Sequence, residues 1–476
     1  MKLGLKTKIS YGLPGTGDST VYNLVGTFSM FFLSTVVGMD PGLAGTIAAI
    51  GSIWETIVGA TMGYISDNVN TRYGRRKPFL MIAAFPIAIF TTMLFTVIDA
   101  GPGFRFVYYT AMMILFWTSF SMFFVPYLAW GAELTHDYDE RTVLRGFTFF
   151  FNNVGTVFGM ILPTVIVDFL ASSGRSEEQS WQLMAMFCGV VAALSIFIGA
   201  AGIKVKVPQS QLNQRKEKKK FSLKAIAARV ADMVANYWGI LKLRTIRFII
   251  LASIFYLIGY GIFGANRMYY FTYNMELSTG KITLIMTVMT FASVAFMPFI
   301  VAATKKWDKR TIYICGMTFS AVFMALFGFF GTMNMVTIVI FSVAYCISSI
   351  CYWQLMPAMI YDVCEVDQLV NNKERAGLVI SLQTLSESFA NAIGLQMLGL
   401  ILKFAGFNGD APAQSDTTLV WTNLCMTIIP AIFMALSIVM IICYPVTKDM
   451  YNKILEALKR RKNGEEINMN EFSKLK

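Results

Sequence analysis

Residues 72–99 read RYGRRKPFLMIAAFPIAIFTTMLFTVID, a cluster of basic residues followed by one long apolar run. The apolar part covers residues 79–99, and roughly twenty apolar residues in a helix suffice to cross a bilayer core about 30 Å thick. Backbone groups inside lipid must be hydrogen-bonded within their own segment, so this run is predicted to be a helix. The stretch therefore predicts a transmembrane helix with positive charge at its start.

The same kind of apolar run recurs along the chain, and each copy is predicted to span the membrane. Hydrophobic residues make up 56% of the 476 residues and charged residues only 14%, whereas a soluble domain carries about 25% charged residues. We therefore predict an all-α membrane protein with twelve transmembrane helices in the cytoplasmic membrane. In chain order, the predicted helices cover residues 19–39, 42–66, 79–99, 106–131, 145–171, 183–203, 247–274, 281–303, 312–331, 335–361, 377–405 and 420–444.

Basic residues in the connecting loops predict the topology. They gather in the loops after the even-numbered helices, which the positive-inside rule places on the cytoplasmic side together with both termini. The net charge of +12 comes largely from these loops and from the linker between the halves, so no nucleic-acid partner is expected. The loop residues are Arg72, Arg75, Arg76, Lys77, Arg141, Lys305, Lys306, Lys309, Arg310, Lys373 and Arg375.

A basic, polar break at residues 204–246 divides the twelve helices into two sets of six. We interpret it as a linker followed by a basic amphipathic helix on the membrane surface, either a simple connector or a lipid-regulatory element. The basic clusters RYGRRK and KWDKR stand at the same place in the two sets and indicate an internal repeat, an arrangement suited to alternating access. We expect a monomer with a six-helix bundle at 1–203, the linker at 204–246, a second bundle at 247–445 and a cytoplasmic tail at 446–476.

Residue types that mark enzymes and metal sites are scarce. The seven cysteines lie almost entirely in apolar segments without a C-x-x-C pair, and His136 is the one histidine. We find no phosphate-binding glycine loop and no nucleophile triad. The chain is therefore predicted not to be an enzyme and to hold neither a metal nor a cofactor. Its start lacks the short apolar core and cleavage site of a signal peptide, so the first apolar segment is expected to stay as a helix.

Several short motifs carry a family resemblance. The pattern G-x-x-x-D at residues 63–67, followed by RYGRR, resembles the major facilitator superfamily. The motifs KISYG, VPYLA, DERT and PAMIYD resemble, within it, the glycoside–pentoside–hexuronide:cation symporter family, the melibiose-carrier group; they begin at residues 8, 125, 139 and 357. The resemblance implies the major facilitator fold of two six-helix bundles, a small sugar-like substrate and a co-transported proton or sodium ion.

The resemblance also implies site residues. Asp18, Trp353, Gln383 and Thr384 match sugar-site or cation-site residues of the melibiose branch. Other positions depart from it. The two helix 2 aspartates of that branch are here Glu55 and Gly59, and the branch has other residues where Phe124, Phe149 and Ser388 stand. Because one helix 2 carboxylate is lost, a proton is preferred to sodium as the coupling ion.

Two acidic residues lie inside predicted helices, where a charge costs about 2.5–3.5 kcal/mol on insertion scales. Glu55 shares a helical face with small and polar residues, and burial disfavours its charged form, so it is a candidate proton carrier. The alternative is a structural carboxylate bonded to a neighbouring helix. Glu387, with Ser388 beside it, lies in a polar stripe and is a second coupling candidate that we expect to share a site with Glu55; tight helix packing is its alternative.

Arg267 is the third charged residue inside a predicted helix. Its guanidinium suits a carboxylate, so an acidic sugar such as a hexuronide is a candidate substrate. A salt bridge to Glu55 or Glu387, or snorkelling to the outer face, would explain the same residue.

Five further residues complete a predicted sugar pocket. The face of Trp353 can stack on a sugar ring, and the amides of Gln354, Asn152 and Asn153 can bond its hydroxyls. Asp18 is either an acceptor for the substrate or a helix cap.

Charged residues at the cytoplasmic helix ends are candidate gates. Pairs between them can hold the halves together when the cavity faces outward; ordinary positive-inside charge is the alternative. We expect a cation-coupled sugar transporter, with an uncoupled facilitator or a lipid-handling or sensor protein on the same fold as alternatives. The gating candidates are Asp67 with Arg75 and Arg76, Asp362 with Arg375, and Arg141.

Overall fold

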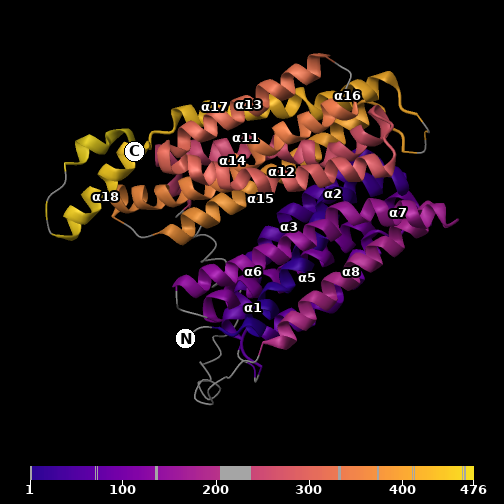
Figure 1. Ribbon diagram of the computed structural model, residues 1–476, viewed down its shortest axis with the longest axis horizontal. Coiled ribbons are helices and arrows are strands. Elements are labelled where there is room, and N and C mark those ends of the chain that lie inside the picture. Colours follow the sequence, from indigo (N-terminus) through magenta and orange to yellow (C-terminus); the bar gives the residue numbers. More distant parts are fainter. Residues whose placement is uncertain are drawn as a thin grey trace. The chain divides into compact units, whose positions relative to one another are not determined.

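The computed structural model of the chain describes residues 3–69, 71, 73–134, 138–203, 237–330, 334–372, 375–409, 411, 413–463, 465 and 468–475. Figure 1 shows that helices dominate these ranges. The bridge between Thr71 and Gly74 is isolated and belongs to no strand. The side chains of Asp67 and Arg141, two of the predicted gating residues, lie outside the described part.

Helices alternate with short connections in both halves, and three of the longer helices contain a π-helical turn. The first half contains α1 (Leu5–Gly12), α2 (Pro14–Phe31), η1 (Phe32–Val36), α3 (Pro41–Asn68), α4 (Lys77–Leu94), α5 (Pro102–Leu134), α6 (Tyr138–Thr156), η2 (Val157–Ile161), α7 (Leu162–Ser172) and α8 (Glu177–Gly202). The second contains α11 (Arg244–Tyr269), η3 (Tyr270–Asn274), α12 (Thr279–Lys306), α13 (Lys309–Phe330), α14 (Met335–Asn371), α15 (Ala376–Phe404), α16 (Asp416–Met426), α17 (Ile428–Cys443), α18 (Lys448–Lys462) and the short 3₁₀ helix η4 (Met469–Leu475).

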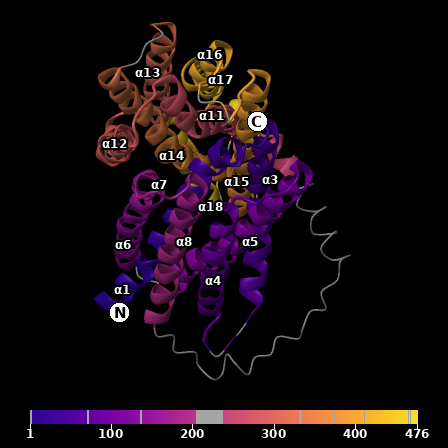
Figure 2. The same cartoon turned by 90° about the vertical axis from the view of Figure 1, so that its right-hand side faces the viewer.

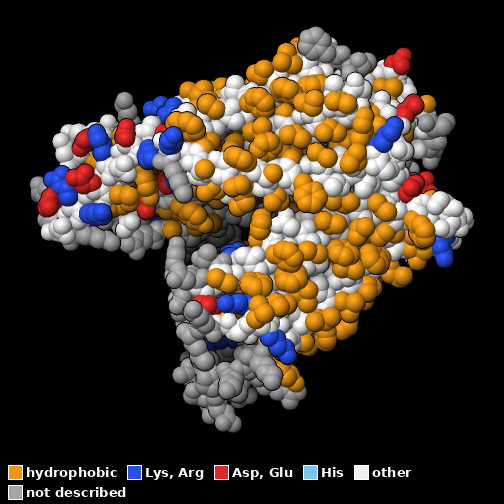
Figure 3. All heavy atoms as spheres, viewed as in Figure 1, with side chains coloured by type: hydrophobic (Ala, Val, Ile, Leu, Met, Phe, Trp, Pro, Cys, Tyr) orange, Lys and Arg blue, Asp and Glu red, His pale blue; other side chains and the backbone are white. Residues whose placement is uncertain are grey.

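The predicted all-α architecture with twelve membrane helices is confirmed. Eleven described helical stretches are long and apolar enough to cross a membrane. The twelfth, α2 continued by η1, is richer in small and polar residues and buries most of them, so it faces protein rather than lipid. On the face drawn in Figure 3, hydrophobic side chains cover the flanks of the helices, and charged ones gather near the helix ends and over α18.

Several helix ends differ from the predicted ones, including the start of α6, which lies at Tyr138 rather than at residue 145. α2 begins at Pro14 rather than near residue 19, because proline is well suited to the first turn of a helix. α14 continues past residue 361 to Asn371, with a polar last section that hydropathy alone does not detect. The last predicted span is broken at Thr427, shortly before Pro430. The predicted surface helix of the linker falls mainly on 204–236, outside the described residues.

The chain forms two compact units. The first comprises Met1–Lys218, Gly264–Thr287 and Leu395–Thr422, and the second Lys219–Phe263, Val288–Gly394 and Asn423–Lys476. In the first, α2 packs against α6 and α8. In the same unit, α4 packs against α5 and α8 (Figure 2). In the second, α13 packs against α14 and α17, and α14 contacts α18. The predicted division into bundles at 1–203 and 247–445 stays a prediction.

The internal repeat is visible in two matching turns. After η1, Val37 N–H donates to Phe32 O at 3.0 Å, and after η3, Met275 N–H donates to Tyr270 O at 3.1 Å. The next residue is left-handed in both turns: Gly38 has φ 67° and Glu276 has φ 48°. Glycine adopts this backbone freely, whereas other L-residues pay about 1–2 kcal/mol.

Replacing Glu276 by glycine is therefore expected to stabilise the protein. Glu276→Ala is the control, because alanine keeps the unfavourable left-handed backbone while removing the same carboxylate. We expect Glu276→Gly to be more stable than Glu276→Ala by about 1 kcal/mol, and Gly38→Ala to be less stable than the parent by a similar amount. Thermal unfolding in detergent measures all three, and equal midpoints for glycine and alanine at 276 would contradict the strain.

Candidate functional site

Two carboxylates of the first unit lie inside neighbouring helices. Asp18, on α2, is 8% exposed, and Glu55, on α3, is half-buried. The two helices contact each other. Asp18 lies in the second turn of α2, whose N-cap is Leu13, so the helix-cap interpretation of Asp18 is wrong. The unit thus holds two acidic groups where a cation, a proton or sugar hydroxyls can be bound.

The contact between α2 and α6 uses one of the predicted sugar-binding amides. With its nitrogen as donor, the Asn152 amide bonds Thr148 O at 3.2 Å and Gly15 O at 3.0 Å. A Cβ at Gly15 would collide with the same amide. Asn152 therefore joins the two helices, and its predicted role in the sugar pocket stays a prediction. Asn153 donates to Phe149 O at 2.8 Å and is half-buried.

A second polar cluster lies in the second unit around Glu387 of α15. Its Oε1 accepts from the Tyr352 hydroxyl of α14 at 2.8 Å and from Gln383 Nε2 at 2.9 Å. Gln383 Nε2 also donates to Ser253 Oγ of α11 at 2.6 Å. The Tyr352 ring stacks on Tyr256 of α11 with centroids 4.4 Å apart. The cluster therefore links α11, α14 and α15 around one carboxylate.

The remaining predicted residues of this unit lie on α14 and α15. Trp353 is 45% exposed and meets Tyr260 and Tyr352 edge-on. Gln354 is half-buried, and the hydroxyls of Thr384 and Ser388 donate to carbonyls within α15. Glu55 and Glu387 belong to different units, so the shared site predicted for them stays a prediction.

Arg267 lies at the C-terminal end of α11, within the first unit. Its Nη2 donates to Thr27 Oγ1 of α2 at 2.8 Å, and the side chain is 8% exposed, so the snorkelling interpretation is wrong. Two residues on, the Tyr269 hydroxyl donates to Met30 O at 3.0 Å and bonds Ser34 Oγ at 2.5 Å. These bonds tie the end of α11 to the end of α2.

Two glycines bring α3 and α15 into backbone contact in the same unit. A Cβ on Gly399 would lie 2.5 Å from Pro41 O and 3.0 Å from the Cα of Gly45. Beside them, Asp40 and Lys403 form an ion pair at 3.2 Å. This arrangement therefore depends on the absence of a side chain at residue 399.

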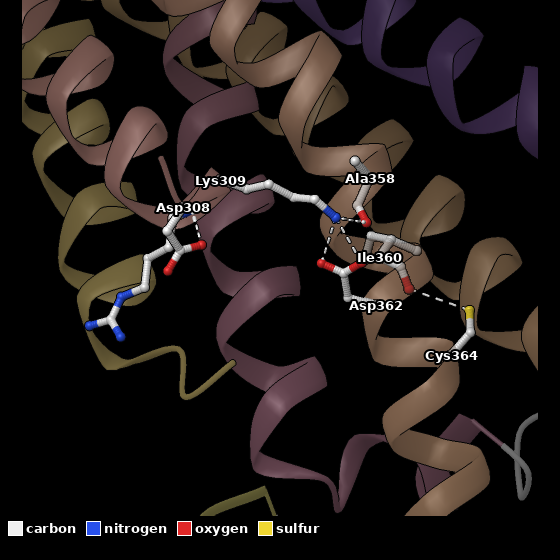
Figure 4. Close-up of polar contacts among 7 residues, drawn as sticks. Asp308, Lys309, Ala358, Ile360, Asp362 and Cys364 are labelled. Carbon is white, nitrogen blue, oxygen red and sulfur yellow. Dashed lines mark hydrogen bonds and ion pairs between the residues drawn. The ribbon is translucent and has the colours of Figure 1, made fainter. Parts of the chain in front are cut away.

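The basic cluster of the second half holds an acidic residue of α14 (Figure 4). Lys309 Nζ lies 2.8 Å from each oxygen of Asp362 and 3.4 Å from Ala358 O. The first half contains a corresponding ion pair. Arg76 Nε lies 3.0 Å from Oε1 of Glu133, at the end of α5. A basic residue at the start of one helix thus pairs with an acidic residue near the end of the following helix in both halves.

The neighbouring basic residues also correspond. Lys77 donates to the carbonyls of Ala201 and Ile203 at the end of α8. Arg310 donates to Ile442 O near the end of α17. Cations are favourable at helix C-termini, where backbone carbonyls lack partners.

The predicted pairing of Asp362 with Arg375 is wrong. Arg375 instead forms two bonds with Asp367, from Nη2 to Oδ1 at 2.6 Å and from Nε to Oδ2 at 3.0 Å. Asp362 and Asp367 both lie in the last turns of α14, and sequence spacing does not distinguish which one faces Arg375. Arg76 bonds Glu133 and Ser66, while Arg75 is exposed. The gating roles of these residues stay predictions.

Motifs that are distant in the sequence meet in the first unit. Tyr11 of KISYG and Tyr127 of VPYLA exchange hydroxyl-to-carbonyl bonds of 3.3 and 2.9 Å. Lys8 of the first motif pairs with Glu140 of DERT at 3.1 Å. These stretches therefore assemble one packed region.

Sequence reasoning missed Tyr352, Ser253 and Lys309 as site residues. Lys309 belongs to the repeated basic cluster, so its correspondence with Arg76 is a usable signal. Tyr352 and Ser253 offered none, because their role depends on which faces of α14 and α11 meet α15. Within the described ranges, no group of three or more His, Cys, Asp or Glu is placed to hold a metal ion.

Known proteins resemble the chain over nearly its whole length. A family model described as MFS/sugar transport protein matches residues 10–448. The isoprimeverose transporter of Lactiplantibacillus pentosus is 24% identical, covering 93% of this chain and 88% of that protein. The glucuronide carrier protein homolog of Escherichia coli (strain K12) is 22% identical, covering 97% of each. The inward open xylose transporter XylE from E. coli superposes with a TM-score of 0.61 at 17% identity, covering 95% and 98% of the two chains, and this likeness shows the fold.

Proposed function

Since the chain belongs to the MFS/sugar transport protein family, and within the major facilitator superfamily to the glycoside–pentoside–hexuronide:cation symporters, we propose that it carries a sugar or glycoside across the cytoplasmic membrane by alternating access. It is a multi-pass membrane transporter rather than an enzyme. Its small-molecule substrate is bound within the bilayer, and the protein works as a monomer with both termini in the cytoplasm.

The presence of two acidic residues, Asp18 and Glu55, within the contacting helices α2 and α3 carries the proposal. Two like charges inside membrane helices are expensive, and such residues mark substrate or ion pathways. In our assignment Asp18 accepts hydroxyls of the sugar and Glu55 binds the coupling cation.

The coupling ion is proposed to be a proton. Sodium needs several oxygen ligands, whereas a proton needs one titratable group. One helical turn after Glu55 stands Gly59, which contributes no carboxylate. Glu55 therefore suits a proton better than a metal ion.

The substrate is proposed to be a neutral glycoside. Asp18, Glu55 and Glu387 put three carboxylates in membrane helices, and these repel an anionic sugar. Arg267, which could otherwise pair with an acidic sugar, donates to Thr27. A hexuronide is the second candidate, because a guanidinium suits a carboxylate and because one relative is described as a glucuronide carrier homolog.

The bonds of Arg267 and Tyr269 to α2 bear on the conformation. With the termini in the cytoplasm, the C-terminal ends of α2 and α11 lie toward the outer side of the membrane. These ends belong to the first unit. The same unit contains the close contact between Gly399 of α15 and Pro41 and Gly45 of α3. We infer that these helix ends close the outer side of the first unit.

Counterflow in proteoliposomes tests transport. Vesicles loaded with unlabelled isoprimeverose are diluted into a trace of labelled isoprimeverose, and the same is done with melibiose, xylobiose and methyl glucuronide. We expect transient accumulation of at least one neutral sugar, in contrast to protein-free vesicles. Exchange of none of the four would favour a lipid-handling or sensor protein, while exchange without pH-driven accumulation would favour an uncoupled facilitator.

Arg267→Gln separates a neutral substrate from an acidic one. For a neutral glycoside, we expect counterflow of neutral sugars and of methyl glucuronide to fall by the same factor, because the substitution disturbs contacts within the protein, such as the bond to Thr27, and none with the sugar. For a hexuronide bound through Arg267, glucuronide exchange should fall about tenfold or more beyond the neutral sugars. Lys403→Gln removes an exposed cation, paired with Asp40, as the control.

A further inference from the structure

The Glu387 carboxylate is held through one of its two oxygens. Tyr352 and Gln383 both donate to Oε1, at 2.8 and 2.9 Å. Every hydrogen bond that the described residues make to Glu387 reaches this oxygen, so Oε2 has its acceptor capacity left over. An oxygen that already accepts two hydrogen bonds takes up a proton less readily than one that accepts none. We therefore expect the proton to bind Oε2.

Gln383 is committed to this carboxylate rather than to a sugar. Its Nε2 donates both to Glu387 Oε1 and to Ser253 Oγ, which uses both amide hydrogens. The side chain is 6% exposed, and its Oε1 is buried without a hydrogen-bond partner. A buried acceptor left unsatisfied is costly. The amide keeps this orientation because its donor end faces the Glu387 oxygen and Ser253.

Neutral donors alone balance the charge of Glu387. Besides Glu387, the titratable groups around the cluster are tyrosines: Tyr352 of α14, Tyr256 and Tyr260 of α11, and Tyr313 of α13, which acts on Tyr352 and Tyr256 but not on Glu387 itself. No described ion pair includes Glu387. Hydrogen bonds to a charged carboxylate are roughly twice as strong as those to a neutral one. Taking up a proton therefore weakens the ties from α15 to α14 and, through Gln383, to α11.

We propose that Glu387 is a second proton-carrying site, in which Tyr352 and Gln383 position Oε1 while Oε2 exchanges its proton with water. The proposal rests on the proposed function, because only a transporter gives this proton a role in coupling. Tyr352 and Gln383 are positioning residues in it, which replaces the sugar-binding role predicted for Gln383. The charge of Glu387 sets how firmly α11, α14 and α15 are joined.

Infrared pH-difference titration of the purified protein in lipid tests the site without any sugar. The carboxyl stretching band lost in Glu387→Gln reports the protonation of Glu387. Tyr352→Phe and Gln383→Met each remove one donor that favours the charged form, so the midpoint of this band should move to higher pH by about one unit in each variant.

Tyr313→Phe is the matched control. It also removes a tyrosine hydroxyl with a bond of 2.8 Å, but that bond is made with Ser437. We expect no shift of the Glu387 band in this variant. A pH-difference spectrum unchanged by Glu387→Gln, or a midpoint unmoved in both Tyr352→Phe and Gln383→Met, would overturn the proposal.

Isoprimeverose counterflow by the same variants separates this proposal from the proposed function. Failure of counterflow by the parent protein would count against isoprimeverose transport and leave the titration result standing. If Gln383 bound sugar directly, Gln383→Met would raise the KM for isoprimeverose even in the Glu387→Gln background. We expect no further increase there, because a positioning residue acts through Glu387.

Discussion

Replacing Glu55 by glutamine is expected to abolish uphill accumulation of sugar while counterflow continues. Glutamine keeps the size of the side chain but takes up no proton, so a proton gradient no longer drives transport. Counterflow requires only exchange through an alternating site, which the substitution leaves in place. Sugar uptake by proteoliposomes under an imposed pH gradient, beside counterflow of the same sugar, is the measurement.

The size of this effect follows from the gradient. For one proton per sugar, a gradient of about one pH unit supports up to about tenfold accumulation. We expect that ratio to fall to one in Glu55→Gln. Asp18→Asn provides the contrast, because loss of the proposed sugar acceptor should reduce accumulation and counterflow together. Undiminished pH-driven accumulation by Glu55→Gln would end the assignment of the proton to this residue.

Replacing Gly399 by valine is expected to stop transport by preventing closure of the outer side. Even a Cβ at this position would lie 2.5 Å from Pro41 O, and both atoms belong to packed helices that cannot yield cheaply. Overpacking of this kind costs about 1–3 kcal/mol, which corresponds to a shift of about five- to 150-fold away from the closed arrangement. Counterflow should fall accordingly, because each cycle must pass through this conformation.

Accessibility distinguishes a trapped transporter from an unfolded one. Thr27 is 5% exposed beneath Arg267, so a cysteine introduced there should react slowly with a membrane-impermeant thiol reagent in an otherwise cysteine-free protein. Adding Gly399→Val should increase that reaction rate. Gly377→Val is the control on the same helix, since a Cβ there has no neighbour within 4 Å. Slow labelling together with normal transport in Gly399→Val would contradict the outer-closure interpretation.

The sequence allowed the twelve helices and the major facilitator fold to be predicted because lipid imposes a simple rule on length and hydropathy. The rule is weakest where a helix faces protein. α2 begins before its apolar section because the segment around Asp18 is buried by α6 and α8 rather than by lipid. The polar end of α14 was not predicted for a related reason: its side chains do not face lipid, so hydropathy gives no signal for it.

The sequence indicated candidate site residues but not their partners. Glu55 and Glu387 stood out because a charge inside an apolar helix is rare, whereas Asp18 was indicated by the family resemblance. Spacing along one helix, however, does not say which neighbouring helix a face will meet. For that reason Asp362 was paired with Arg375 instead of Lys309, and Tyr352 went unnoticed beside Trp353.

The turns that contain Gly38 and Glu276 have an evolutionary consequence. Two copies of one unusual turn at equivalent places are what a gene duplication leaves behind, with a single ancestral six-helix polypeptide giving rise to both halves. Glycine accepts the left-handed backbone without strain and glutamate does not, so the ancestor is expected to have carried glycine. Reconstruction of ancestral sequences should therefore place glycine in both copies, with glutamate arising later in the second.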